Sequence, residues 1–178
     1  MEIDFLNSQC QSVSNKKLFG LCDEQDNKEP AYLDERNGDK WIAVVENEKL
    51  KEVHFIAIDN CIDIWRDEVK KEMDNRCDGM LWYGERTVIF VELKNRESKK
   101  DKNAWVEEGE KQLKRTIEYF EKTEQSNKFT EKRAYIANKA YPKFKESQLQ
   151  RMKSFKQETG YTLRIENRIK IPYINTPS

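Results

Sequence analysis

A short apolar run that ends in charged residues is the feature that most constrains the fold. Val88–Val91 are four consecutive β-branched or aromatic residues, and they predict a strand buried on both faces because neither face is polar. Glu92 and Lys94 continue that strand. Because side chains alternate along a strand, both charged side chains point to one side of the predicted sheet. Charges at the end of a buried strand require a structural or chemical reason.

A second carboxylate is expected beside this pair. Asp78 heads the preceding predicted strand, and Gly84-Glu85 between the two strands predicts a tight turn and therefore a hairpin. The hairpin brings Asp78 next to Glu92 and Lys94. Two carboxylates packed together cost free energy unless a cation or a proton compensates their charge. The three side chains therefore predict, in outline, a site for a divalent metal ion.

The tripeptide acid-x-Lys carries little information by itself in a chain of which 37% is charged. It occurs again at Asp26 and Lys28, at Glu68 and Lys70, and at Glu97 and Lys99. An ordinary ion pair at a sheet edge is the alternative interpretation of Glu92 and Lys94. That interpretation leaves Asp78 unexplained, so the conjunction of strand, turn and second acid favours the metal site.

Composition limits the class of protein. A length of 178 residues fits one domain with a sizeable core. No apolar run approaches the roughly 18 residues of a membrane span, and the N-terminus lacks the regions of a signal peptide, which predicts a cytoplasmic protein without a membrane segment. The four cysteines lack Cys-x-x-Cys spacing and the chain has a single histidine, so zinc and disulfide bonds are both weakly indicated.

Charge is unevenly distributed although the formal net charge is zero. Residues 1–93 contain 12 Lys and Arg against 21 Asp and Glu, and residues 128–178 contain 12 against 4. The basic surface could face a polyanion or could simply be solvated, and the two interpretations are equally favoured. Zero net charge argues against tight unaided binding to nucleic acid, so a homodimer or a partner subunit could supply further basic surface.

The region before the hairpin is predicted to be mainly β-structure. Residues 1–15 lack clear periodicity, and Asn37-Gly38 is a strong signal for a two-residue β-hairpin turn. The expected elements are a strand over 16–22, a β-hairpin formed by 31–33 and 41–46, a strand over 51–58 and a short helix over about 62–73.

The region after the hairpin alternates helices and strands. A charged loop over 95–103 precedes the most secure helix, residues 104–123, in which apolar residues recur at spacings of three and four. A strand over 133–137, a helix over 143–158 ended by Gly160, a strand over 161–166 and an irregular tail complete the expectation. The order predicts a single α/β domain over residues 1–178, with a mixed central sheet flanked by helices, a right-handed βαβ unit and an extra N-terminal β-hairpin.

Five residues together resemble the motif of the PD-(D/E)XK nucleases, the restriction-endonuclease-like superfamily. They are Asp78, the run Glu92-Leu93-Lys94 at the end of a hydrophobic strand, and Gln112 on the following helix. The resemblance covers about residues 50–137 and implies a restriction-endonuclease-like fold. Cys77 stands at the position of the proline that gives the family its name.

The resemblance implies a role for each of these residues. Asp78 and Glu92 would bind Mg²⁺ together with the backbone carbonyl of Leu93, and Mn²⁺ would substitute. Lys94 would position the attacking water, and Gln112 would support the site. A further acid often joins such sites. Asp59 is the preferred candidate, although it could instead cap a helix, and Glu68 and Glu72 are less favoured.

The function that follows is magnesium-dependent hydrolysis of DNA phosphodiester bonds, and the preference for DNA comes from the resemblance alone. A basic loop after Lys94 could contact the phosphate backbone or could merely be solvated. Its residues are Arg96, Lys99, Lys100 and Lys102. Two alternatives stay open. One is a catalytically inactive domain that binds nucleic acid or protein, and the other is a structural ion pair without a metal.

Overall fold

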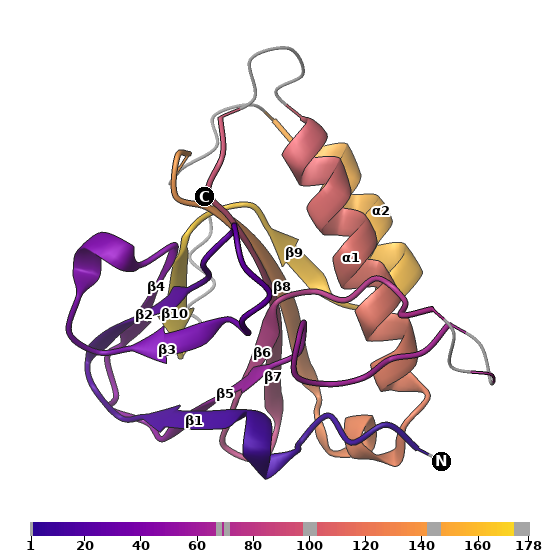
Figure 1. The fold of residues 1–178 in the computed structure, drawn as a ribbon, viewed down its shortest axis with the longest axis horizontal. Helices are drawn as coiled ribbons and strands as arrows, with labels where there is room; N and C mark the ends of the chain where they lie inside the picture. The colour runs from indigo at the N-terminus through magenta and orange to yellow at the C-terminus, as the bar shows by residue number, and fades with distance from the viewer. Residues whose placement is uncertain (1, 67–68, 70–71, 98–102, 142–146, 173–178) are drawn as a thin grey trace.

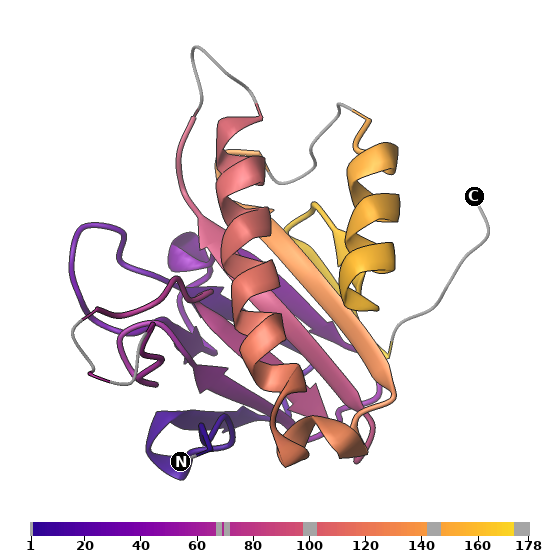
Figure 2. The ribbon, with the colours of Figure 1, turned by 90° about the vertical axis from the view of Figure 1, so that its right-hand side faces the viewer.

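The computed structural model describes residues 2–66, 69, 72–97, 103–141 and 147–172 (Figure 1). These residues form a mixed α/β structure with two mixed β-sheets and two α-helices. Both helices lie on one face of the larger sheet and the smaller sheet lies on the other face (Figures 1 and 2). Neither of the two described α-helices is long and apolar enough to cross a membrane.

The larger sheet has six strands in the order β1-β5-β6-β7-β8-β9. Pairing is antiparallel from β1 to β7 and parallel from β7 to β9, so the sheet is mixed as predicted. Its strands are β1 (Gln11–Ser14), β5 (Val53–Ala57), β6 (Gly79–Tyr83), β7 (Thr87–Lys94), β8 (Glu131–Asn138) and β9 (Thr162–Arg164).

Strand β7 lies in the middle of the molecule, and all of its residues are buried. Helix α1 (Ala104–Glu121) connects it to the parallel strand β8, which confirms the predicted helix and the parallel β7–β8 pairing. Helix α2 (Leu149–Thr159) lies beside α1 and ends at Gly160, whose φ of 81° is the left-handed conformation expected of a glycine cap. The apolar side chains of α1 bury the helix-facing side of the sheet, and they are Trp105, Val106, Leu113, Ile117 and Phe120.

The smaller sheet has four strands in the order β10-β4-β2-β3. They are β10 (Arg168–Ile171), β4 (Ala43–Asn47), β2 (Leu18–Cys22) and β3 (Tyr32–Asp34). Alternate residues of β7 face the two layers: Val88 and Phe90 join the core under the helices, whereas Ile89, Val91 and Leu93 join the core between the sheets. Two apolar layers therefore explain why β7 has no polar face. Short 3₁₀ helices complete the structure at Ser8–Cys10, Gly38–Lys40 and Glu124–Lys128.

The predicted hairpin at Asn37-Gly38 is wrong. Strand β3 pairs with β2 and not with β4, and Asn37 has a φ of −112° where the hairpin turn needs a positive value. The carboxylate of Asp34 accepts hydrogen bonds from the Asn37 backbone N–H at 2.7 Å and from Trp41 Nε1 at 2.8 Å. These side-chain contacts stabilise a wider connection, and a four-stranded sheet replaces the expected extra hairpin.

Three further expectations also need correction. The described residues of 62–73 contain no helix, and Trp65 instead forms an isolated antiparallel bridge with Met73. Helix α2 begins at Leu149, later than expected, while 143–146 lie outside the described residues. The tail that was expected to be irregular contributes β10, which pairs in parallel with β4. The local sequence does not predict this pairing, because β4 lies more than a hundred residues before β10 in the chain.

A disulfide bond joins Cys10 to Cys61 across a sequence separation of 51 residues. It links the N-terminal segment to the turn that follows β5. The weak indication from cysteine spacing was therefore misleading, because a single long-range pair leaves no spacing pattern. The other two cysteines, Cys22 and Cys77, are buried free thiols.

Candidate active site

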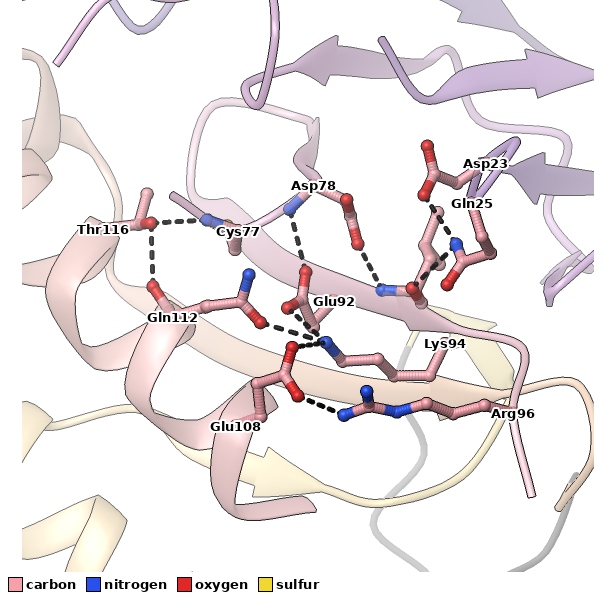
Figure 3. A network of polar contacts seen from close by, with 11 residues as sticks. Asp23, Gln25, Cys77, Asp78, Glu92, Lys94, Arg96, Glu108, Gln112 and Thr116 are labelled. Atoms are coloured by element: carbon pink, nitrogen blue, oxygen red, sulfur yellow. Dashed lines mark hydrogen bonds and ion pairs between the residues drawn. The ribbon is translucent and has the colours of Figure 1, made fainter. Parts of the chain in front are cut away.

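The hairpin of β6 and β7 places two carboxylates side by side at one end of the larger sheet (Figure 3). Asp78 directly precedes β6, and Glu92 lies near the end of β7. The Asp78 backbone N–H donates to Glu92 Oε1 at 3.2 Å, and the Leu93 backbone N–H donates to Asp78 Oδ2 at 2.6 Å. Each carboxylate therefore binds the backbone of the strand that carries the other one, which fixes both in position.

Gly79 makes this arrangement possible because the chain passes very close to β5. A Cβ atom at Gly79 would lie 2.5 Å from the ring of Phe55 and 2.7 Å from the carbonyl oxygen of Ile56. Only glycine allows this close approach without a shift of β6. Gly79 therefore allows β6 to pack closely against β5, and this packing places the carboxylate of Asp78 at the end of the sheet.

Glu92 is a buried carboxyl group whose negative charge would be only partly compensated. Its side chain is 1% exposed, and Oε2 accepts no hydrogen bond from the residues that the structure describes, although Lys94 Nζ lies 3.3 Å away. Burial and the neighbouring charge of Asp78 raise the pKa of Glu92 well above its ordinary value, and Lys94 only partly opposes this. The pair of carboxylates therefore favours a positive charge between them.

The ammonium group of Lys94 has three oxygen neighbours. Besides Glu92 Oε2, they are Glu108 Oε1 at 3.1 Å and Gln112 Oε1 at 3.1 Å. Burial lowers the pKa of Lys94, but the carboxylates of Glu92 and Glu108 outweigh it and the pKa lies above its ordinary value. Lys94 is thus held as a cation between the end of β7 and α1.

Helix α1 supplies both Glu108 and Gln112, which lie one turn apart. The helix is tied to β6 by Thr116, whose Oγ1 accepts the Cys77 backbone N–H at 2.8 Å and donates to the Gln112 carbonyl at 2.9 Å. Glu108 also forms an ion pair with Arg96, just after β7. The sequence had not indicated Glu108, although its spacing of four from Gln112 places both on one helix face.

Asp23 and Gln25 also lie at the site, and no sequence pattern indicates either residue. They follow β2 of the smaller sheet and lie near the end of β7 (Figure 3). Gln25 Nε2 donates to Asp23 Oδ2 at 2.6 Å and to the Leu93 carbonyl at 3.4 Å. Burial and the charges of Asp78 and Asp59 raise the pKa of Asp23 to about 7. A third carboxylate therefore adds to the negative potential of the site.

The structure brings together Asp78, Glu92, Leu93, Lys94 and Gln112. Asp59 lies in the turn after β5, where its backbone N–H donates to the Cys77 carbonyl at 3.2 Å and its side chain pairs with Arg76 Nη2 at 3.1 Å, and it caps no helix among the described residues. Burial raises the pKa of Asp59, and the charge of Asp78 adds to this effect.

Less favoured acids and the basic loop make up the remaining predictions. Glu72 pairs with Arg66 at 3.1 Å, and Glu68 lies outside the described residues. Arg96 lies against Glu108 at the site. Lys99, Lys100 and Lys102 also lie outside the described residues.

The comparisons with protein-family models, with curated proteins and with solved structures yield no match. Within the part of the chain that the structure describes, no group of three or more His, Cys, Asp or Glu residues is arranged to hold a metal ion. The groups of this site that could take part in chemistry are therefore the pair of Asp78 and Glu92 and the side chains that contact them.

Proposed function

We propose that this chain is a magnesium-dependent nuclease that hydrolyses DNA phosphodiester bonds on a restriction-endonuclease-like core. The observation that carries the proposal is the buried carboxylate of Glu92, which lies beside Asp78 and, among the described residues, contacts one backbone N–H and the ammonium group of Lys94. The antiparallel β6–β7 hairpin, the crossover helix α1 and the parallel strand β8 support it, because the resemblance to PD-(D/E)XK nucleases implies this same order.

The residues present fit a divalent cation. Mg²⁺ prefers oxygen ligands and is commonly held by only one or two protein carboxylates, so Asp78 and Glu92 suffice. The raised pKa of Glu92 means that its anion is disfavoured without further positive charge, and a cation would restore the anion. The Leu93 carbonyl would complete the protein ligands, and Mn²⁺ would substitute for Mg²⁺.

The surrounding side chains have distinct roles in this proposal. Bound Mg²⁺ would stabilise negative charge on the phosphate and lower the pKa of a water molecule. Lys94 keeps a positive hydrogen-bond donor next to the carboxylates, where it would position the attacking water. Gln112 accepts a hydrogen bond from Lys94 and so orients the ammonium group. Arg96 lies on the solvent side of this group and would contact the DNA backbone.

A cleavage assay tests the proposal. The purified protein is incubated with plasmid, linear duplex, single-stranded DNA and RNA, in Mg²⁺, in Mn²⁺ and in chelator. We expect metal-dependent cleavage of DNA, and a rate at least about a hundred-fold lower for Asp78→Asn and for Lys94→Ala. Lys28→Ala is the matched control, because Lys28 ends the same acid-x-Lys pattern in an exposed loop.

A catalytically inactive binding module is the second candidate function. The observation that favours it is that Lys94 already has an oxygen neighbour for each of its three N–H bonds. DNA binding without cleavage of any substrate in either metal would support this second function and contradict the first. Equal cleavage by the parent and by Lys94→Ala would also contradict the nuclease proposal.

A further inference from the structure

Three oxygens surround the ammonium group of Lys94 in the proposed nuclease site, two as hydrogen-bond acceptors and one, Glu92 Oε2, as an ion-pair partner. An ammonium group has three N–H bonds, and here Glu92, Glu108 and Gln112 provide three oxygens within 3.3 Å of Nζ. A substrate phosphate or an attacking water can therefore contact Lys94 only after one of these oxygens leaves. The identity of the oxygen that leaves decides how substrate enters.

Glu108 is the neighbour that can leave most easily. The side chain of Glu92 is 1% exposed, whereas that of Glu108 is 49% exposed and can turn into solvent without burying its charge. Gln112 is neutral, so its departure would remove no negative charge from the path of an anion. Departure of Glu108 removes a full negative charge from the place where a phosphate would bind.

The carboxylate of Glu108 also has the surroundings of a bound phosphate. One oxygen contacts the ammonium of Lys94 and the other contacts the guanidinium of Arg96. Carboxylates and phosphates can both accept two parallel hydrogen bonds from a guanidinium group, and both bind the ammonium group of a lysine. Burial raises the pKa of Glu108, but the hydrogen bond from Arg96 and the charge of Lys94 outweigh it, and the pKa lies below the ordinary value. The side chain is therefore an anion that two cations hold on the exposed side of the site.

We propose that Glu108 is a placeholder for the substrate phosphate, and that a DNA phosphodiester displaces it from Lys94 and Arg96. This inference rests on the proposed function, because it assigns the substrate-binding step of the same site. In this arrangement Arg96 contacts the bound phosphate directly, and Glu108 restrains DNA binding by competing for both cations.

Binding measurements in chelator test the inference without cleavage. Fluorescence anisotropy of a labelled short DNA duplex is recorded for the parent and for Glu108→Gln at several salt concentrations. We expect Glu108→Gln to bind about five-fold more tightly, since one competing ion-pair partner has been removed. We also expect the slope of log affinity against log salt to become steeper by about one, since the substitution raises the net positive charge that the site presents to the DNA by one.

Glu107→Gln is the matched control. Glu107 is the adjacent residue on α1, its side chain is 56% exposed, and its ion pair is with Arg151 at 3.8 Å. The substitution changes the net charge by the same amount without touching Lys94 or Arg96. We expect a smaller gain in affinity for this variant than for Glu108→Gln. Equal gains would overturn the inference, because general charge would then explain the effect.

Two more variants separate a placeholder from a residue that merely positions Lys94. Glu108→Ala should bind DNA as tightly as Glu108→Gln, and Arg96→Ala should bind about five-fold more weakly than the parent. Unchanged or weaker binding by both Glu108 variants, with parent-like melting temperatures, would overturn the inference. Inorganic phosphate is added as a competitor to separate the two sources of phosphate. If it binds more tightly to Glu108→Gln while DNA affinity is unchanged, the site accepts only the free ion and the inference fails.

The inference and the proposed function fail in different ways. Tighter DNA binding by Glu108→Gln, without metal-dependent cleavage by any variant, would support the displaced carboxylate and contradict the nuclease. Cleavage that depends on Asp78 and Lys94, together with slower cleavage and no tighter binding in Glu108→Gln, would support the nuclease and contradict the displacement.

Discussion

The pKa values of two buried carboxylates, Asp74 and Glu92, are shifted in opposite directions. Asp74 is 6% exposed and Glu92 is 1% exposed. Burial raises the pKa of Asp74, but hydrogen bonds from Arg115 and Tyr119 outweigh it and lower the pKa to about 2. Burial and the charge of Asp78 raise the pKa of Glu92 well above its ordinary value. Burial alone therefore does not decide the charge of a carboxylate in this fold.

The number and sharing of donors explain the difference. Asp74 Oδ2 accepts from Arg115 Nε at 2.6 Å and from the Tyr119 hydroxyl at 2.5 Å, so its charge is compensated within the chain. Glu92 has one backbone donor and a lysine that it shares with Glu108. Asp74 is thus a complete structural tie between α1 and the segment before β6. Glu92 has the incomplete compensation expected of a group that binds a cation.

The largest expected difference between the two carboxylates is in metal affinity. Glu92→Gln should weaken Mn²⁺ binding by at least about a hundred-fold, because it removes a charged group that we propose as a ligand. Asp74→Asn should leave the affinity of the folded protein unchanged, since Asp74 lies outside the proposed site. Isothermal titration calorimetry with Mn²⁺ measures both. Equal affinities for the parent and Glu92→Gln would remove the distinction between the two carboxylates.

The stability of the two variants should differ in the opposite order. Asp74→Asn leaves Arg115 without its buried partner and should lower the free energy of unfolding by about 2 to 3 kcal/mol. Glu92→Gln removes an under-compensated buried charge and should raise it by about 1 kcal/mol in metal-free buffer. Urea unfolding at neutral pH measures both changes. A loss of stability in Glu92→Gln as large as that in Asp74→Asn would mean that both acids are structural.

The pH dependence of stability should distinguish the two groups by sign. The pKa of Asp74 falls from 3.8 to about 2 on folding, so its contribution is present above pH 4 and is lost as the pH falls toward 2. This contribution amounts to about 2 kcal/mol. The pKa of Glu92 rises on folding, so its contribution is largest below its ordinary value of 4.5 and is lost as the pH increases.

Unfolding at a series of pH values, with the parent and each variant compared at every pH, isolates these contributions. Asp74→Asn should flatten the decline of stability on the acid side. Glu92→Gln should flatten the loss of stability that accompanies rising pH in the absence of metal. An effect of Glu92→Gln confined to the acid side would show that the pKa of Glu92 is lowered rather than raised.

The parts of the fold that could be predicted are those whose partners are close in sequence. The apolar run in β7, the turn at Gly84 and the stripe on α1 determine the β6-β7-α1-β8 unit through short connections. Strand β10 could not be predicted, because its pairing of Arg168 with Val44 depends on the whole intervening chain. Local patterns also misled where tertiary or side-chain contacts outweighed them, as Asp34 does beside Asn37.

The candidate site could likewise be predicted only where its residues are close in sequence. A hairpin and one crossover helix suffice to bring Asp78, Glu92 and Lys94 near Gln112, so these four could be found from sequence order and period. Asp23 and Gln25 could not, because they arrive only when the smaller sheet packs on the larger one. The charged loop that contains them resembles any solvated loop in a chain of this composition.

The smallest expected effect is that of a substitution at Gly109, the residue of α1 that lies against Ile136 and Glu92. A Cβ atom at Gly109 would lie 3.1 Å from a side-chain carbon of Ile136 and 3.4 Å from Cγ of Glu92. Alanine favours a helix over glycine by about 1 kcal/mol, and the crowding against Ile136 opposes this gain. We therefore expect Gly109→Ala to change the free energy of unfolding by less than about 1 kcal/mol.

Metal affinity should respond to Gly109→Ala more than stability does, because Ile136 would have to shift by a few tenths of an ångström and the added methyl group would contact Cγ of Glu92. A decrease of about three-fold in Mn²⁺ affinity is expected, since the geometry of a ligand set tolerates little displacement. Lys111→Ala, an exposed change in the same helix, is the control and should leave both quantities unchanged. A loss of stability with unchanged Mn²⁺ affinity would show that Gly109, like Asp74, has a structural role and does not affect the position of Glu92.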